Sequence, residues 1–311
     1  MSSYKISTAQ KAQIEGQGFT LLPAALPSGI LKRWQKLAQQ LETNALDAHE
    51  RSKQTHGACV IQDPVGPRLM RYDDVLGIDP SAVIELLACP AMIAVARELC
   101  GRNAIPLQLD ILYKHQHPHP VIMWHQGAPH PRSYAYFNIG IYLDDANPND
   151  GCLQYVPNTQ HELQDIAGLA KNHGWAIPGA VEQPAKAGDI LIQDMMILHG
   201  SPPKRSPGTR RTIYVELRTV EGVLESEAQS SQWIELRKRW MGLVLKHAEA
   251  GSWPEEWQQD YPTDLGSLQM ESENILRYHE PPIPAVYGIQ DFDQTDYPVP
   301  ADMRNPESEG I

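Results

Sequence analysis

The feature that most constrains the fold is a series of short β-type segments between residues 105 and 218. These segments alternate with turns rich in Pro, Gly, Asn and Asp, and no helical pattern interrupts them. Strand following strand in this way indicates an antiparallel sandwich or barrel. We predict a mainly β fold with flanking helices and a double-stranded β-helix (jelly-roll, cupin-like) core. The predicted strands are Leu107–Tyr113, Tyr136–Leu143, Cys152–Val156, Gly188–Ile192 and Thr212–Arg218.

Helical patterns occupy the chain before and after this β-rich region. The segment Ser7-Thr8-Ala9-Gln10 has the form of a capping box, which predicts a short helix that stops at Gly16 or Gly18. Further helices are predicted from an N-cap at Ser28, over residues 81–99 with a second segment starting at Pro90, and over Ser231–His247.

The chain is expected to form one domain with three parts. Residues 1–104 form a helical and lid region, residues 105–220 form the jelly-roll core, and residues 221–311 form a helical, Pro-rich extension. Residues 49–80 are predicted to be a loop with room for one strand. The extension shows no core of its own, so we expect it to pack on the barrel, to cover its mouth or to make a homodimer contact.

Composition narrows the classes of partner. The net charge of −12 disfavours nucleic acid and anionic membranes as default partners, so an anionic ligand would need a local cluster of Arg and Lys. The chain has neither an apolar run of 18 residues nor a basic and apolar leader, so we predict a cytoplasmic protein. Its four cysteines lack CxxC spacing and are predicted to be free thiols.

Two histidines are candidates for metal binding. His125 follows the apolar run 121–124, and His199 follows the run 190–198. At strand ends of a barrel, both side chains could point into one mouth. A non-haem iron site needs two neutral imidazoles, usually one carboxylate, and open positions for other ligands. Taken alone, either histidine is more often structural, so the prediction depends on finding the rest of the site.

Two arginines follow the second histidine. An Arg at the head of a strand could hold a carboxylate bidentately. Strand alternation puts Arg210, Thr212 and Tyr214 on one face and Arg211 on the other. We therefore expect one arginine to face the site and the other to face solvent or a surface partner. The alternative is that both are charges at the rim.

Together these pieces resemble the phytanoyl-CoA dioxygenase (PhyH) family of Fe(II)/2-oxoglutarate-dependent oxygenases. The resemblance covers roughly residues 5 to 218, and its motifs occur in the family's order. The segments that carry it are Gly18 to Pro23, Trp124-His125-Gln126, Asn138 to Ala146, Gly151 to Pro157, Gly188-Asp189, and Leu198-His199-Gly200-Ser201 followed by Arg210.

The resemblance implies a role for each matched residue. His125 and His199 would bind Fe(II), and Arg210 would bind the distal carboxylate of 2-oxoglutarate. Asn138 would contact the same co-substrate, and O₂ would be the second co-substrate. Gly140 stands where many relatives have Trp, which suggests a roomier pocket.

Gly127 departs from the family pattern. Relatives have His-x-Asp, whereas this chain has His125-Gln126-Gly127 and so lacks the third ligand. In relatives that halogenate unactivated carbon, this Asp is replaced by Ala or Gly. Chloride carries the same single negative charge as the missing carboxylate, so Gly127 would leave an open halide position. Gln126, Asn138 or backbone N–H groups around Gly127 and Ala128 could hold the anion.

Two other interpretations of Gly127 remain open at this stage. The chain could be a hydroxylase that carries a natural or engineered Asp-to-Gly change. It could also be a non-catalytic binding protein on the same fold, although the retention of His199, Arg210 and Asn138 counts against that.

The substrate itself is not predicted from the chain. Candidate contacts near the barrel mouth are Trp124, Tyr113, Tyr134 and Gln126. A substrate tethered to a carrier protein is disfavoured, because carrier proteins are acidic and this chain is acidic as well.

Overall fold

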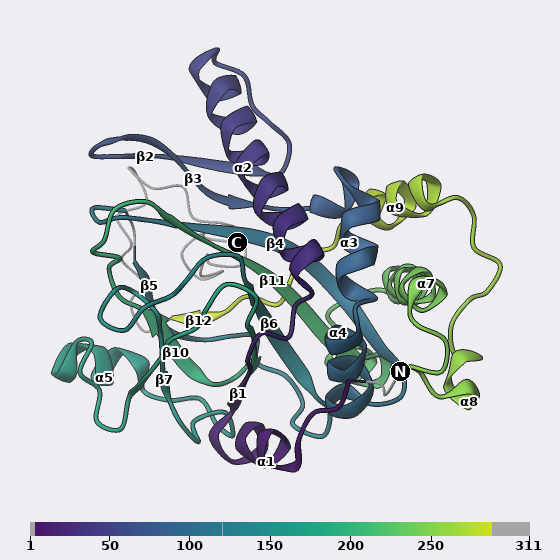
Figure 1. Ribbon diagram of the computed structural model, residues 1–311. Coiled ribbons are helices and arrows are strands. Elements are labelled where there is room, and N and C mark those ends of the chain that lie inside the picture. The colour runs from purple at the N-terminus through teal and green to yellow at the C-terminus, as the bar shows by residue number, and fades with distance from the viewer. Residues whose placement is uncertain (1–3, 120, 288–311) are drawn as a thin grey trace.

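The computed structural model describes residues 4–119 and 121–287, and its strands form two antiparallel sheets (Figure 1). The seven-stranded sheet has the order β1-β9-β6-β11-β4-β3-β2, and the five-stranded sheet has the order β12-β5-β10-β7-β8. This arrangement confirms the predicted mainly β fold with flanking helices. The strands are β1 (Phe19–Leu22), β2 (Ala58–Asp63), β3 (Gly66–Tyr72), β4 (Ala104–His115), β5 (Ile122–Gln126), β6 (Tyr136–Tyr142), β7 (Leu153–Val156), β8 (Val181–Gln183), β9 (Ile190–Asp194), β10 (Leu198–Ser201), β11 (Thr209–Thr219) and β12 (Val286–Tyr287).

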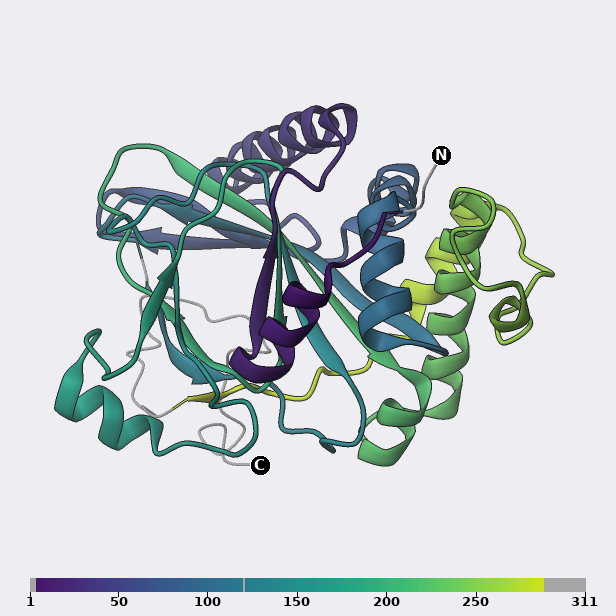
Figure 2. The same cartoon turned by 60° about the horizontal axis from the view of Figure 1, so that its bottom comes forward.

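The helices lie outside the two sheets. Helix α2 runs along the seven-stranded sheet, and α5 lies at the opposite side of the molecule, next to the five-stranded sheet (Figure 2). The helical segments are α1 (Thr8–Gln17), α2 (Ser28–Glu50), η1 (Val75–Gly77), α3 (Pro80–Leu87), α4 (Pro90–Val95), the π-helical η2 (Ala96–Cys100), α5 (Ile166–His173), α6 (Val220–Ser226), α7 (Ser231–His247), α8 (Glu255–Gln258) and α9 (Leu268–Arg277).

Helix starts follow the expected capping chemistry with one exception. The capping box of Ser7 and Gln10 is present, and α1 ends at Gly18 in the left-handed conformation. Ser28, however, is the first residue of α2 and not its N-cap. Pro27 takes the N-cap position, with φ −55° and ψ 135° and no side-chain hydrogen bond. Proline has the extended backbone that precedes a helix, but its side chain offers no acceptor to the first-turn N–H groups.

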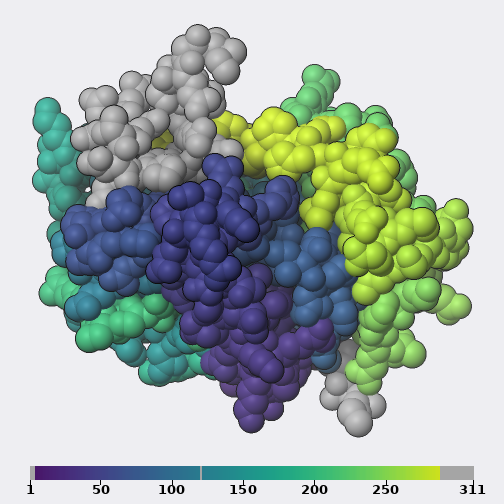
Figure 3. Space-filling model, turned by 90° about the horizontal axis from the view of Figure 1, so that it is seen from above, coloured from purple at the N-terminus to yellow at the C-terminus, as the bar shows by residue number. Residues whose placement is uncertain are grey.

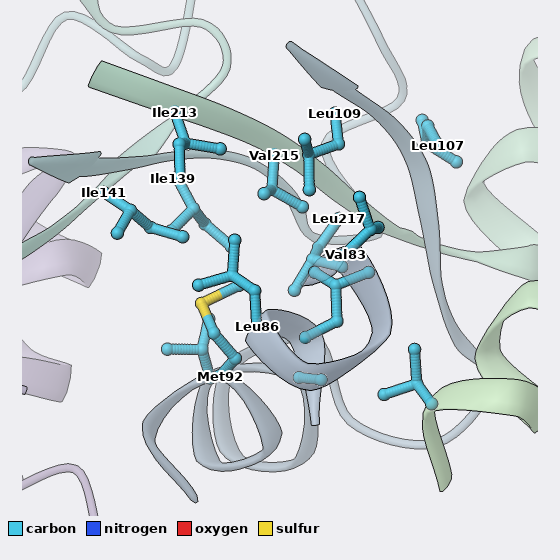
Figure 4. Close-up of a cluster of buried hydrophobic side chains, with 14 of the residues drawn as sticks. Val83, Leu86, Met92, Leu107, Leu109, Ile139, Ile141, Ile213, Val215 and Leu217 are labelled. Carbon is cyan, nitrogen blue, oxygen red and sulfur yellow. The ribbon is translucent and has the colours of Figure 1, made fainter. Parts of the chain in front are cut away.

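The main core lies between the seven-stranded sheet and the helices. Alternate residues of β6 and β11 point outward, where they pack on α3 and α4 (Figure 4). Burying each aliphatic side chain of this size stabilises the fold by roughly 1.5–3 kcal/mol. The residues in this layer include Val83, Leu86, Met92, Ile139, Ile141, Ile213, Val215 and Leu217.

Three sequence-based assignments need correction. Residues 49–80 hold the end of α2 and a hairpin of two strands, β2 and β3, where a loop with one strand was expected. His125 lies inside β5 and His199 inside β10, whereas both were expected just beyond strand ends. The two strands are short and pair with each other, so the histidines are held by a ladder of backbone hydrogen bonds.

The C-terminal segment packs against the rest of the chain. Helix α9 contacts α3 and α7, and the yellow segment that contains α9 lies beside the blue N-terminal half in Figure 3. Strand β12 pairs with β5, where Tyr287 lies opposite His125.

Within the described ranges, no helix has the length and apolar character needed to cross a bilayer. All four cysteines are free, as predicted.

Candidate metal and co-substrate site

The two predicted metal ligands face each other across neighbouring strands. His125 of β5 and His199 of β10 are directly paired in the sheet register. Their ring centroids lie 4.1 Å apart, and both residues are less than 10% exposed. Tyr287 stacks on the His125 ring at 4.9 Å. Residues 74 positions apart in the chain thus form one pair of imidazoles at the interior face of the five-stranded sheet.

Hydrogen bonds orient both imidazole rings. Nδ1 of His125 lies 2.8 Å from the Met123 carbonyl oxygen, and Nδ1 of His199 lies 2.8 Å from that of Ile197. A carbonyl only accepts, so each Nδ1 carries the proton, and a metal could be bound only through Nε2. Burial, with His125 as a secondary cause, lowers the pKa of His199 well below its ordinary value. The ring is therefore neutral, which is the form that ligates metals.

Gln193 is an interior residue that the sequence analysis missed. Its Nε2 donates to Nε2 of His199 at 3.0 Å, and its Oε1 accepts from the Tyr155 hydroxyl. Tyr155 in turn stacks on Phe19 at 4.3 Å, which fixes the amide. The contact places the His199 lone pair on the interior side of the sheet. A polar residue directly after the apolar triplet 190–192 was the available sequence signal.

Gly127 is packed closely against Met195. Its N–H donates to the Met195 carbonyl oxygen at 2.8 Å. A Cβ at position 127 would overlap that oxygen and would come within 2.5 Å of Sδ and 2.8 Å of Cγ of the same residue. Real Cβ atoms do not approach backbone oxygens so closely, so any side chain here requires the backbone at residue 195 to move. The surroundings of position 127 are shaped for glycine.

The two histidines have no third ligand at hand. Within residues 4–119 and 121–287, no three His, Cys, Asp or Glu side chains are grouped so that they could hold a metal ion. The donor set among the described residues is therefore the pair of imidazole Nε2 atoms. Such a pair fits a divalent metal whose remaining positions are taken by ligands from solution.

Two buried cations lie a short distance from the histidines. Arg210 of β11 and Lys114 of β4 are paired in register and are 2% and 3% exposed. Lys114 Nζ donates to the carbonyl oxygen and Oγ of Ser201, at 2.8 and 2.6 Å. Arg210 donates to the Gly151 carbonyl, and its Nη2 lies 3.5 Å from Ser201 Oγ. Burial, reinforced by Arg210, lowers the pKa of Lys114 well below its ordinary value.

Several polar atoms around Arg210 and Lys114 lack hydrogen-bond partners within the described chain. Within the described chain, Arg210 Nε, Thr212 Oγ1 and Tyr142 OH are buried without a hydrogen-bond partner. Two adjacent buried cations with unused donors fit a small anion. Ser201 lies two residues after His199 on β10, a spacing of roughly 7 Å in a strand. A dicarboxylate as short as 2-oxoglutarate can bridge this distance.

Arg211 confirms the predicted alternation along β11. It faces away from the site and forms a bidentate ion pair with Asp144, with Nε–Oδ2 and Nη2–Oδ1 both at 2.8 Å. Its Nη1 also donates to the Gln35 carbonyl. Of the two neighbouring arginines, Arg210 therefore belongs to the interior and Arg211 to the outer face.

A small cavity of about 110 Å³ lies in front of the histidines. Asn138 lines it, and its buried Oδ1 has no hydrogen-bond partner within the described chain. Gly140 does not enlarge the pocket, contrary to expectation. A Cβ there would meet Tyr214 Cε1 at 3.3 Å and Thr212 Cγ2 at 3.5 Å, so neighbouring side chains already fill the space.

The four predicted substrate contacts lie outside the cavity at the histidines. The Gln126 amide forms hydrogen bonds with backbone groups. Its Nε2 donates to the carbonyls of residues 159, 162 and 196, and its Oε1 accepts from the N–H of residue 164. Trp124 donates to the Gly174 carbonyl and packs on Trp175. Tyr113 donates to the Ala38 carbonyl under α2. Neither these three nor Tyr134 lines the cavity at the histidines or the larger one beside it.

A larger cavity of about 280 Å³ adjoins the small one. It is bordered by the hairpin β2–β3, by β4 and β11, and by α7 and the chain after α9, so three separate parts of the sequence enclose it. Both cavities share the five lining residues Arg71, Gln108, Asp110, Glu216 and Ile283.

Sequence comparisons agree with this geometry. Residues 14–212 match the family described as phytanoyl-CoA dioxygenase (PhyH). L-proline trans-4-hydroxylase of Streptomyces griseoviridis is 30% identical over 105 residues, which are 29% of this chain and 37% of that protein. Methylphosphonate hydroxylase of Gimesia maris is 27% identical over 182 residues, which are 53% of this chain and 65% of that protein.

Solved structures show the same fold. AviO1 from Streptomyces viridochromogenes superposes with a TM-score of 0.58 at 24% identity, over 71% of this chain and 98% of its own. HygX from Streptomyces hygroscopicus, with nickel and 2-oxoglutarate bound, gives 0.56 at 18% identity, over 70% and 88%. EctD from S. alaskensis, with bound Fe, gives 0.56 at 21% identity, over 70% and 78%.

Proposed function

The chain belongs to the phytanoyl-CoA dioxygenase family, and from this premise we propose that it is an Fe(II)- and 2-oxoglutarate-dependent enzyme that functionalises a C–H bond of a small molecule. We further propose that the reaction is halogenation, with chloride as the halide. The observation that carries this second step is Gly127, which brings no carboxylate to the two histidines, so that a position on the metal is left for an anion from solution.

His125 and His199 would hold the iron through Nε2. When bound, iron with 2-oxoglutarate and O₂ supplies the oxidising power that removes a hydrogen atom from the substrate, while 2-oxoglutarate is converted to succinate and CO₂. The backbone carbonyls at Nδ1 fix both rings in direction and hold the proton on Nδ1, which leaves Nε2 for the metal. The protein thus contributes two neutral donors and no negative charge.

The cationic pair Arg210 and Lys114 would bind the distal carboxylate of 2-oxoglutarate. An anion there would accept from the unpaired Arg210 Nε and would relieve the repulsion between two adjacent buried cations. Ser201 already contacts both residues, so it would orient them. The side-chain amides of Asn138 and Gln193 lie nearer the histidines, and their N–H groups would donate to the other end of the co-substrate or to a bound anion.

The charge balance favours a halide. A family site with one Asp carries one more negative charge than this pair of histidines, and chloride supplies that charge from solution. Gly127 as an isolated change in a hydroxylase would leave a gap, whereas Met195 fills the space next to it. The Gly127 N–H is already used by the Met195 carbonyl. We therefore assign the role of anion donor to Gln193, whose amide N–H now donates to His199 Nε2 at 3.0 Å and would be released when that nitrogen binds iron.

Hydroxylation is the second candidate, because the two curated relatives are hydroxylases. In that case water, and not chloride, would complete the metal site. The two candidate functions use the same residues and differ only in whether chloride or water completes the metal site.

The test is a product assay with the iron-loaded protein. The enzyme is supplied with 2-oxoglutarate, O₂ and a panel of small molecules, in chloride, in bromide and in halide-free buffer. Halogenation predicts products whose mass follows the halide supplied. A hydroxylated product formed at the same rate in all three buffers would establish the second candidate. If no substrate raises succinate production above the iron-free control, the chain is a binding protein.

Gln193→Glu sharpens this test, because it places a carboxylate beside His199 without any change in size. The Tyr155 hydroxyl can still donate to it. We expect the halide dependence to be lost, since the carboxylate supplies the negative charge. Gln62→Glu, on the exposed side of β2, is the matched control. An unchanged halide dependence in Gln193→Glu would remove Gln193 from the site.

A further inference from the structure

Arg218 lines the larger cavity, and part of its guanidinium has no hydrogen-bond acceptor among the described residues. It is 1% exposed and lines the cavity from the end of β11. Its Nη1 reaches only Ser226 Oγ, at 3.3 Å, and Nε and Nη2 have no hydrogen-bond partner within the described chain. The guanidinium lies over the Tyr136 ring at 4.7 Å. Buried guanidinium donors are normally paired, so these two nitrogens indicate a missing acceptor.

The other two arginines of the cavity provide a contrast. Arg71 forms ion pairs of 2.5 Å with both Asp73 and Asp110. Arg237 donates to the carbonyls of residues 107 and 275, at 2.8 and 3.3 Å, and its guanidinium lies 4.2 Å from the centre of the Trp233 ring. Both are explained by the fold. Among the described residues, Arg218 differs from these two arginines in having two buried guanidinium nitrogens, Nε and Nη2, without an acceptor.

The position of Arg218 relates it to the metal site. Glu216, two residues earlier on the same face of β11, lies where the two cavities join. It accepts from Gln108 at 2.8 Å and from the Tyr136 hydroxyl. Two residues of strand span roughly 7 Å, so Arg218 lies about one small molecule's length beyond the junction. Asp110, at the same junction, adds a second carboxylate.

We propose that the larger cavity binds the substrate, and that the substrate is a small molecule with one anionic group, a carboxylate or a phosphate, held by Arg218. Its other end is uncharged or cationic and lies at the junction, because Glu216 and Asp110 disfavour a second negative charge there. The rings of Tyr136, Trp233 and Trp240 border the body of the molecule. This assignment rests on the proposed function, since it makes the junction the place where a C–H bond meets the metal site.

The test measures binding of simple probes to the nickel-loaded protein saturated with 2-oxoglutarate, so that Arg210 and Lys114 are occupied. The probes are inorganic phosphate, acetate and benzoate, with acetamide and benzamide as uncharged counterparts. We expect the anions, and not the amides, to raise the midpoint of thermal unfolding. The comparison of phosphate with the carboxylates identifies which anion the pocket prefers.

Arg218→Gln should weaken probe binding at least about tenfold, the usual loss for a buried charged hydrogen bond. Arg218→Lys, which keeps the charge, should recover part of the binding. Arg277→Gln, at an exposed residue of α9, should bind the probes as the wild type does. Amides that stabilise as well as the anions, or an Arg218→Gln protein that keeps the effect, would overturn the proposal.

The outcome is distinguishable from a failure of the proposed function. If 2-oxoglutarate binds in an Arg210-dependent manner but Arg218→Gln does not weaken probe binding, only the substrate assignment is wrong. If the probes bind through Arg218 but no 2-oxoglutarate binds, the proposed function is wrong and the anion pocket stands.

Discussion

The two faces of strand β11 show how one strand serves stability and chemistry separately. Outward-facing Ile213 and Val215 are fully buried in the hydrophobic core cluster that includes the helices (Figure 4). Inward-facing Arg210, Thr212 and Arg218 are just as buried, yet each has a polar atom without a hydrogen-bond partner within the described chain. Unpaired buried polar groups destabilise a fold, so their concentration on one face indicates that ligands complete it.

The largest expected effect tests the outer face. Ile213→Ala removes apolar volume from a fully buried position and should lower the free energy of unfolding by about 2–5 kcal/mol. Thr212→Val, at the neighbouring inward-facing position, replaces a hydroxyl that has no hydrogen-bond partner within the described chain. It should change the free energy of unfolding by less than about 1 kcal/mol. Urea denaturation of both proteins measures the difference. Equal losses would contradict the division between the two faces.

The second effect tests the inner face through binding. Arg210→Gln should weaken 2-oxoglutarate binding about 100-fold, because a buried charge-assisted contact is lost. Arg211→Gln breaks the ion pair with Asp144 on the opposite face and should leave the affinity unchanged. Calorimetric titration of the nickel-loaded proteins with 2-oxoglutarate gives both values. A matching loss in Arg211→Gln would show that the effect is structural.

The third effect concerns the packing at Gly127. Gly127→Ala should lower the free energy of unfolding by about 1–3 kcal/mol, since a Cβ overlaps the backbone at Met195. Gly66→Ala would be a poor comparison because of its positive φ, so Gly16→Ala, with open space at its Cα, is the control. Thermal unfolding compares the two. An Ala at 127 that is tolerated as well as one at 16 would contradict the close packing.

The smallest effect is a pH dependence from Lys114. Its pKa is lowered in the folded state, chiefly by burial. Between that lowered pKa and 10.5 the unfolded chain binds more protons, so the free energy of unfolding of the wild type, measured without 2-oxoglutarate, increases as the pH rises. Lys114→Met should show a flatter profile in denaturant titrations from neutral to alkaline pH. An identical slope would mean that Lys114 is not the group responsible.

Much of the architecture could be predicted because it follows from local patterns. The capping box at Ser7, the helix Ser231–His247 and the alternation along β11 depend on residues close in the chain. The hairpin β2–β3 could not, because Gly57, Pro64, Gly66 and Pro67 interrupt the local pattern and β3 owes its place to pairing with β4. Of the four expected substrate contacts, Trp124, Tyr113 and Gln126 use their polar atoms in hydrogen bonds to distant backbone groups, and Tyr134 lines neither cavity.

Sequence alone determined the strand alternation, the order of the motifs and the identity of His125, His199 and Arg210, because each depends on residue type and local spacing. Tertiary structure alone decided which residues join them. Lys114, Gln193 and Arg218 come from separate strands, and sheet register brings them to one interior. The same holds for Gly127, where the sequence reveals a missing carboxylate, but only the packed Met195 shows that the space beside it is occupied. Register is set by contacts between distant strands, and no local pattern encodes it.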